Sequence, residues 1–210
     1  MRIDLHVHTR RHSPCSSIDP AAVVPTAIQA GLQGVVITEH EYQWSQAELE
    51  ALRRQSFAPE FLVLAGFEYR TLRGDLLVYG LENEAYKDFL PGMTSRQATE
   101  KATALGGACI AAHPTRAGMD FDLAIADSRL AGLEVCSSNL QPHERRLAMK
   151  LSKALEIPPV AASDAHAAKD IGRYATEFEA PVETAAGLQN ALRNGRFQVS
   201  EEVVKESGIW

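Results

Sequence analysis

The chain has 210 residues, of which 45% are hydrophobic and 23% are charged, a balance typical of one soluble globular domain. Its formal net charge of -6 argues against a broad polyanion-binding surface, because such surfaces depend on clustered lysines and arginines. No apolar run approaches the roughly 20 residues of a membrane helix, and the polar start MRIDLHVHT is unlike a signal peptide. We therefore expect a cytoplasmic protein with one domain over residues 1–210, no extended nucleic-acid surface and no membrane partner.

Short apolar runs recur along the chain and predict seven strands, over residues 3–7, 34–38, 61–66, 76–79, 108–112, 132–136 and 159–163. Several runs, such as GVVIT and FLVLAG, are continuously apolar, which is typical of parallel strands buried on both faces. Helical patterns separate them. The first has Asp19 as predicted N-cap and Gly31 as stop, and Thr94 caps another. Alternating strands and helices predict an α/β barrel or an open α/β sheet.

Five of the seven histidines, together with two acids, stand at or just beyond the ends of predicted strands: His6, His8, His40, Glu68, His113, Asp164 and His166. The carboxyl ends of parallel strands converge on one pocket, so we expect these side chains to meet there. Imidazole nitrogens and carboxylate oxygens are ligands of zinc, manganese and iron. Their number exceeds the needs of a single ion, which predicts more than one metal.

The motifs DLHVHT, ITEHE, GFE, AHP and SDAH follow one another in the order found in the polymerase and histidinol phosphatase (PHP) family, and the chain resembles that family. The resemblance implies the α/β class and a distorted (β/α)7 TIM-like barrel. It also implies a trinuclear centre at the carboxyl-end rim, holding two to three divalent transition metals (Zn, Mn or Fe). The sequence does not identify the metal.

The resemblance also implies a ligand set for each ion: His6 and His8 with Asp164 for the first, Glu68 as a bridge between the first and second, His113 for the second, and His40 with His166 for the third. Two positions depart from the family pattern. Asp75 stands where many relatives have a histidine, and its alternative role is a turn aspartate. The remaining ligand of the third ion is expected at His12, with Cys15 as the alternative.

Other polar residues are expected to support the ligands. Asp4, Glu39 and Glu134 are predicted to orient imidazoles, and Ser137, Ser138 or Asn139 is expected to line the pocket. A purely structural use of Glu134 and of these three residues is equally compatible with the sequence. Arg116, in the motif HPTR, is the best candidate to pair with a substrate phosphate, because a guanidinium fork suits that geometry.

Most characterised stand-alone members of the family are phosphoesterases, so the resemblance implies a metal-dependent hydrolase. We expect a metal-bridging hydroxide to attack phosphorus without a protein nucleophile, on a small phosphorylated substrate such as a phosphomonoester. Three alternatives remain: a nuclease or phosphodiesterase, an amidohydrolase-like enzyme that cleaves C-N or C-O bonds, and a non-catalytic regulatory module. The sequence does not indicate the oligomeric state.

Overall fold

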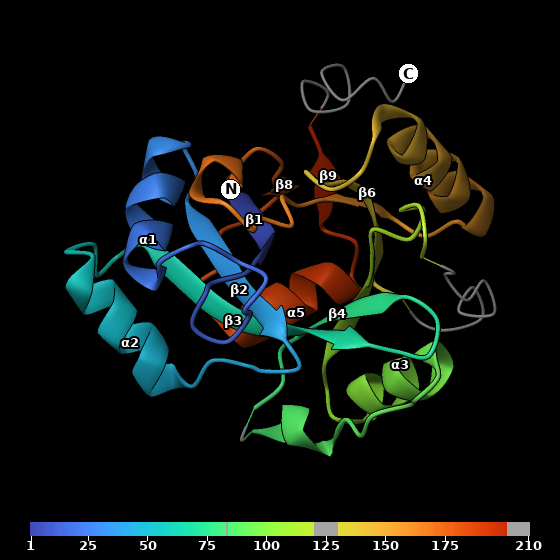
Figure 1. The fold of residues 1–210 in the computed structure, drawn as a ribbon, viewed down its shortest axis with the longest axis horizontal. Helices are drawn as coiled ribbons and strands as arrows, with labels where there is room; N and C mark the ends of the chain where they lie inside the picture. Colours follow the sequence, from blue (N-terminus) through green and yellow to red (C-terminus); the bar gives the residue numbers. More distant parts are fainter. Residues whose placement is uncertain (83, 120–129, 201–210) are drawn as a thin grey trace.

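The computed structural model describes residues 1–82, 84–119 and 130–200. One nine-stranded sheet curls into a nearly closed barrel with helices around it (Figure 1). The strand order is β7-β6-β5-β4-β3-β2-β1-β8-β9. The strands are β1 (Arg2–Val7), β2 (Gly34–His40), β3 (Leu62–Arg70), β4 (Asp75–Tyr79), β5 (Ala108–Ala112), β6 (Gly132–Cys136), β7 (Pro159–Ala161), β8 (Thr176–Phe178) and β9 (Phe197–Val199).

The helices are α1 (Pro20–Gln29), α2 (Gln46–Gln55), α3 (Ser95–Ala104), α4 (Pro142–Leu155) and α5 (Ala185–Arg193), with short 3-10 turns η1 (Ala85–Asp88) and η3 (Ala168–Asp170). Helices α1 and α2 cover one outer side of the barrel, and α3 and α4 cover the other (Figure 1). Within the described ranges, none of the helices has the length and apolarity that crossing a bilayer requires.

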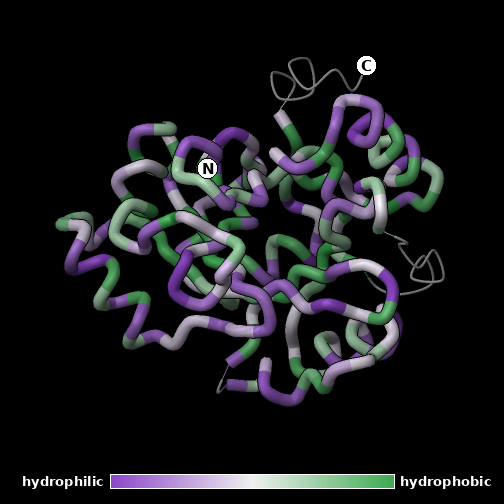
Figure 2. The backbone as a smooth tube through the Cα atoms, viewed as in Figure 1, coloured by the Kyte–Doolittle hydropathy of each residue, from purple (hydrophilic) through white to green (hydrophobic). Residues whose placement is uncertain are grey.

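Apolar side chains fill the interior of the barrel, where Ile3, Leu5 and Ile110 belong to one buried cluster. Leu188 and Leu192 of α5 join this cluster and close the end of the barrel at which the parallel strands begin. The surface helices instead bury one face each, and hydrophobic and hydrophilic residues alternate along α2 and α4 (Figure 2). The packed interior leaves the opposite mouth for polar side chains.

The barrel closes where the chain after β7 meets β1. Val7 and Ala165 form a parallel bridge. In it, the amide of His8 donates to the carbonyl of Ala165 (3.0 Å), and the amide of Ala165 donates to the carbonyl of His6 (3.1 Å). This junction brings the SDAH motif beside the HVH motif, although more than 150 residues of chain separate them.

The buried carboxylate of Asp4 ties this junction together. It accepts hydrogen bonds from the amide and hydroxyl of Ser163 (2.9 and 2.5 Å), the amide of Gly172 (2.9 Å) and the amide of His6 (3.3 Å). The expectation that Asp4 orients an imidazole ring is therefore corrected, because its partners are backbone amides and a hydroxyl. Burial raises the pKa of Asp4 to about 6, although the four donors act in the opposite direction.

Replacing this carboxylate should destabilise the whole barrel. Asp4→Asn puts an amide nitrogen opposite N–H donors, so we expect a loss of about 3 kcal/mol in the free energy of unfolding. Urea denaturation followed by far-UV circular dichroism measures the loss, with Asp88→Asn at an exposed position as the control. A midpoint equal to that of the parent protein would contradict the structural role of Asp4.

The expected strands are present, and the runs 108–112 and 132–136 coincide with β5 and β6. One expectation needs correction: the strands are not all parallel, because β4 runs antiparallel to both β3 and β5. The chain between β3 and β4 is a tight turn at Gly74, whose φ of 88° suits glycine, so no helix separates these strands. The reversal places Asp75, the first residue of β4, opposite Arg70 and Ala112 at the ends of β3 and β5.

Candidate metal centre

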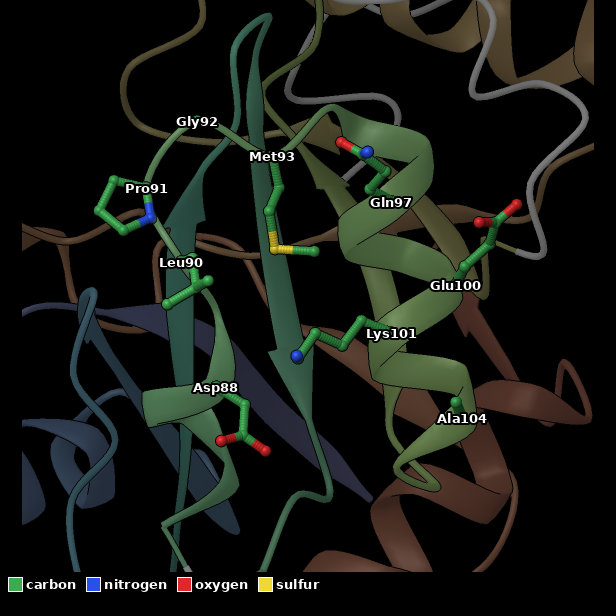
Figure 3. A pocket seen from close by; sticks show the side chains of 9 residues that line it. All are labelled: Asp88, Leu90, Pro91, Gly92, Met93, Gln97, Glu100, Lys101 and Ala104. Carbon is green, nitrogen blue, oxygen red and sulfur yellow. The ribbon is translucent and has the colours of Figure 1, made fainter.

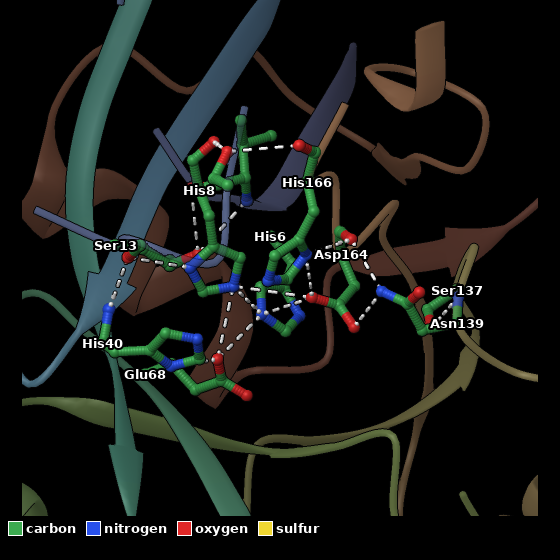
Figure 4. A network of polar contacts seen from close by, with 12 residues as sticks. His6, His8, Ser13, His40, Glu68, Ser137, Asn139, Asp164 and His166 are labelled. Carbon is green, nitrogen blue, oxygen red and sulfur yellow. Dashed lines mark hydrogen bonds and ion pairs between the residues drawn. The ribbon is translucent and has the colours of Figure 1, made fainter. Parts of the chain in front are cut away.

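The mouth of the barrel collects histidine and carboxylate side chains from five strand ends. Figure 4 shows how His6, His8, His40, Glu68, Asp164 and His166 lie there. Alternation along β1 places His6 and His8 on the same side, and both are buried. His40 ends β2 and Glu68 lies near the end of β3, while His113 follows β5 directly. Asp164 and His166 come from the segment that closes the barrel after β7.

Three groups of these side chains have their ligand atoms within 4.8 Å of one another: His8 with His40 and His166; His6 with Glu68 and His113; His6 with His8 and Asp164. These are the residues that the sequence placed around three ions. His6 and His8 each belong to two groups, so the groups form one continuous cluster.

Glu68 lies at the centre of the cluster. Its Oε2 atom is 2.9 Å from Nδ1 of His40 and 3.2 Å from Nε2 of His8, and its Oε1 atom is 3.0 Å from Nε2 of His113. Nε2 of His6 is 3.5 Å from the same Oε2 atom. One carboxylate thus faces four imidazoles.

Several buried atoms of the cluster lack hydrogen bonds, which tests whether a metal fits. Within the described part of the chain these atoms include Oε2 of Glu68, Oδ1 of Asp164, Oδ1 of Asp75 and Nδ1 of His113. Imidazole nitrogens lie near the first two oxygens without the alignment of a hydrogen bond. Unpaired buried acceptors are costly, and atoms that converge on shared space rather than on each other suit a cation. The residues present fit divalent metal ions.

Opposite charges within the cluster shift its titration. Burial acts to raise the pKa of Glu68, but the charge of His6 and the adjacent imidazoles of His113 and His40 hold it well below its ordinary value. Burial acts to lower the pKa of His6, but the carboxylates of Asp164, Glu134 and Glu68 raise it well above its ordinary value. Without metal, His6 therefore favours the imidazolium form and Glu68 the carboxylate form.

Glu134 of β6 contacts two histidines of the cluster, His6 and His113. Its Oε1 atom lies 3.0 Å from Nδ1 of His6, and its Oε2 atom accepts from the amide of His113 at 2.7 Å. The contact with His6 is the one that an imidazole-orienting role requires.

His113 and Asp164 have φ angles of 28° and 49°, in the left-handed region that non-glycine residues rarely occupy.

Glu39 has a different role from the one predicted. Its carboxylate accepts from the amide (3.0 Å) and hydroxyl (2.5 Å) of Thr9 and from the indole nitrogen of Trp44 (3.0 Å). Because these partners belong to the loops after β1 and β2, Glu39 fixes the loops around the mouth and does not orient an imidazole.

His12 does not join the cluster, which corrects the expected third-ion ligand. Its ring stacks on Tyr42 at 3.9 Å between centroids, and its Nε2 atom lies 3.1 Å from Oε1 of Glu48 at the start of α2. The bounds of helix α2 were not predicted from the sequence, and this helix provides the carboxylate of Glu48 that His12 contacts instead of the cluster. Cys15, the alternative, is exposed and belongs to none of the three groups found among the described residues.

Asp75 and Arg116 lie at the rim beside the cluster rather than within its three groups. Nη2 of Arg116 is 3.9 Å from Oδ2 of Asp75, and Nη1 is 3.7 Å from Oδ2 of Asp164. Arg70 approaches the other oxygen of Asp75, with Nε 3.7 Å from Oδ1. Burial and the charge of Glu68 raise the pKa of Asp75.

Ser13 and Asn139 support the ligands, and of these two only Asn139 was expected near the pocket from the sequence. The hydroxyl of Ser13 lies 3.3 Å from Nδ1 of His8 and accepts from the amide of His40 at 3.1 Å. Asn139, after β6, donates its side-chain amide to Asp164. Asn139 directly follows an apolar strand in the segment LEVCSSN, which indicated it, whereas Ser13 lies in a loop without such a signal.

A separate groove lies outside the barrel, between α3 and residues 88–93 (Figure 3). Its lining includes Asp88, Glu100 and Lys101 and none of the clustered side chains. The chemistry of metal binding therefore belongs to the mouth and not to this groove.

A family model described as PHP-associated (PHP_C) matches residues 142–197, from α4 to the first residue of β9. No curated protein matches the chain.

Solved structures share the fold over most of the chain. PsfC from Pseudomonas syringae is 19% identical with a TM-score of 0.71, over 99% of this chain and 96% of that one. A two-domain protein from Bacteroides vulgatus, which contains a predicted PHP-like metal-dependent phosphoesterase, is 20% identical with a TM-score of 0.68, over 94% of this chain and 63% of that one. The lesion-specific endonuclease EndoQ from Pyrococcus furiosus is 17% identical with a TM-score of 0.67, over 94% and 57%. At these identities the likeness establishes the barrel.

Proposed function

We propose that this chain, a protein of the PHP domain family by its family match and its fold, is a metal-dependent phosphoesterase that hydrolyses a small phosphomonoester. The observation that carries the proposal is the cluster at the barrel mouth, where three overlapping groups of imidazoles and carboxylates leave buried acceptor atoms unpaired.

We assign two to three divalent ions to these groups. His6, His8 and Asp164 would hold the first ion, and Glu68 would link it to a second ion beside His113. His40 and His166 would hold a third ion together with His8. The side chains of His40 and His166 are 32% and 28% exposed, so this third group lies at the opening, where a substrate arrives.

When bound, such ions supply Lewis-acid neutralisation of phosphate charge and lower the pKa of water toward neutrality. The protein contributes the remaining positioning. Glu134 fixes the ring of His6, and Arg116 holds a guanidinium above the rim, within reach of Asp164 and Asp75. Both carboxylate contacts of Arg116 exceed 3.5 Å, and its side-chain hydrogen bond is to a weak acceptor, Sδ of Met119 (3.5 Å), so its donors can turn to a substrate phosphate. The proposal uses no protein nucleophile.

Arg116→Ala should impair substrate binding more than metal binding. Loss of a charge-assisted hydrogen bond predicts a KM for a phosphomonoester that is roughly 10- to 100-fold higher, with the bound metal unchanged. Steady-state kinetics and elemental analysis of the same preparations measure both. Arg54→Ala, on the exposed face of α2, is the control, and Arg116→Lys should recover only part of the loss because it lacks the fork. Unchanged kinetics would remove Arg116 from the site.

The reaction class can be tested with manganese-loaded protein and a panel of p-nitrophenyl phosphate, bis-p-nitrophenyl phosphate, phosphorylated metabolites, short oligonucleotides, amides and lactones. Turnover of monoesters above the other classes is the expected result. Preference for diesters or oligonucleotides would favour a nuclease, and preference for amides or lactones would favour an amidohydrolase-like enzyme. Turnover of none of them by metal-loaded protein would favour a regulatory module.

A further inference from the structure

Asn139 makes two contacts with a single residue of the cluster. Its side-chain nitrogen Nδ2 donates to Oδ2 of Asp164 at 2.8 Å and to the carbonyl oxygen of Asp164 at 3.0 Å. The amide thus holds both the carboxylate and the backbone of Asp164, which is the residue whose φ of 49° is left-handed (Figure 4).

The two oxygens of Asp164 have different surroundings. Oδ2 accepts from Asn139 and lies 3.7 Å from Nη1 of Arg116 and 3.8 Å from Nε2 of His113. Oδ1 has no hydrogen bond among the described residues, and it lies 3.4 Å from an imidazole nitrogen of each of His6, His8 and His166. The carboxylate is therefore oriented, with one oxygen held by protein donors and the other turned to the cluster.

The turn that carries Asn139 is itself anchored. The amide of Asn139 donates to the hydroxyl of buried Ser137 at 3.3 Å, and the amide of Ser138 donates to the carbonyl of Ser163 at 2.9 Å. Residues 137–139 after β6 are thus bonded to residues 163–164 after β7. Asn139 itself is exposed, so its side chain contributes little to the packed core.

We propose that Asn139 is a positioning residue that fixes Asp164, so that Oδ1 faces the metal cluster and Arg116 can turn from Oδ2 to the substrate. A neutral amide suits this role because it donates without adding charge beside the cations. Arg116 also lies near Oδ2, and it leaves that oxygen when it binds phosphate. Asn139 then keeps the carboxylate in place. The inference rests on the proposed metal binding and not on the identity of the substrate.

Manganese binding to the metal-free full-length chain tests this role without any activity measurement. For Asn139→Ala, calorimetric titration should show binding to at least one site weakened by roughly 10- to 100-fold, the usual cost of losing a partner that orients a ligand. The metal-free variant should still unfold cooperatively, with a melting temperature only about 2 to 8 °C lower, because the side chain is exposed and only its two hydrogen bonds to Asp164 are lost. Asn139→Gln, which keeps the amide on a longer arm, should recover part of the affinity.

Ser138→Ala is the matched control, because Ser138 lies in the same turn and its hydroxyl has no hydrogen bond among the described residues. It should bind manganese like the parent. The inference is overturned if Asn139→Ala binds manganese within twofold of the parent, if Ser138→Ala loses as much affinity, or if Asn139→Ala changes only KM. A parent that binds manganese but hydrolyses no phosphate ester would contradict the proposed function and leave the role of Asn139 to be decided by these affinities.

Discussion

Glu68→Gln is expected to remove most of the bound metal and to lower phosphoesterase activity by more than the roughly 10- to 100-fold cost of losing an orienting partner. Glu68 is the carboxylate that faces the imidazoles of His6, His8, His40 and His113. Glutamine keeps the shape of the side chain but removes its charge, and it turns one acceptor into an N–H donor. The variant therefore loses the atom that links the groups of the cluster.

Elemental analysis of purified protein and kinetics on a phosphomonoester check this result. Glu100→Gln, at an exposed position on α3, is the control for loss of one negative charge. Cooperative thermal unfolding of the metal-free variant would show that the barrel still forms. Glu68→Gln protein with the full metal content and rate of the parent would mean that the central position of Glu68 has no role in metal binding.

Metal removal should reverse the way stability depends on pH. In the metal-free fold, nearby carboxylates raise the pKa of His6, His8 and His113 above the ordinary value of 6.5, against the effect of burial. That stabilisation is complete below pH 6.5 and is lost as pH rises through the raised values. The depressed pKa values of Glu68 and Asp164 act in the opposite sense: their contribution is present above 4.5 and 3.8, respectively, and is lost as pH falls.

Metal binding requires neutral imidazoles, so protons compete with the ions, and the stabilisation by metal should grow as pH rises. At an ion concentration 1,000 times the Kd, one site contributes about 4 kcal/mol, which corresponds to a rise in Tm of roughly 8 to 16 °C for a chain of this size. As pH rises from 6 to 8, the contribution of this cluster to stability should fall in the chelator-treated protein and rise in the manganese-loaded protein.

Thermal unfolding at pH 6 and pH 8, with chelator and with added manganese, measures all four states. Calcium, which prefers more oxygen ligands than this cluster offers, is the control ion. A manganese-induced rise in Tm that is equal at both pH values, or larger at pH 6, would contradict the assignment of neutral histidines as ligands.

The sequence predicted those parts of the site that depend on local pattern. Alternation in β1 places His6 and His8 together, and apolar strands that end in His40 or His113 deliver their side chains to the mouth. The reversal of β4 could not be predicted in this way, because an apolar run of four residues (76–79) has the same appearance in either direction. Its direction depends on the turn at Gly74.

Contacts between side chains that are distant in the chain could not be predicted from the sequence either. Asp4 and Glu39 are acids beside histidines in the chain, yet they bind Ser163 and Trp44 instead. His12 is close to His8 in sequence, yet its neighbour is Glu48 of a helix that the apolar pattern did not indicate. Proximity along the chain suggested that these three residues contact the clustered histidines or their metals, whereas tertiary packing gives them other partners.

Because His6 and His8 each serve two of the three groups, the groups cannot fill independently. An ion that enters one of them withdraws lone pairs and adds positive charge beside the next. Titration with metal should therefore trace one coupled isotherm, and an ion of the wrong kind in a single position would disturb its neighbours as well.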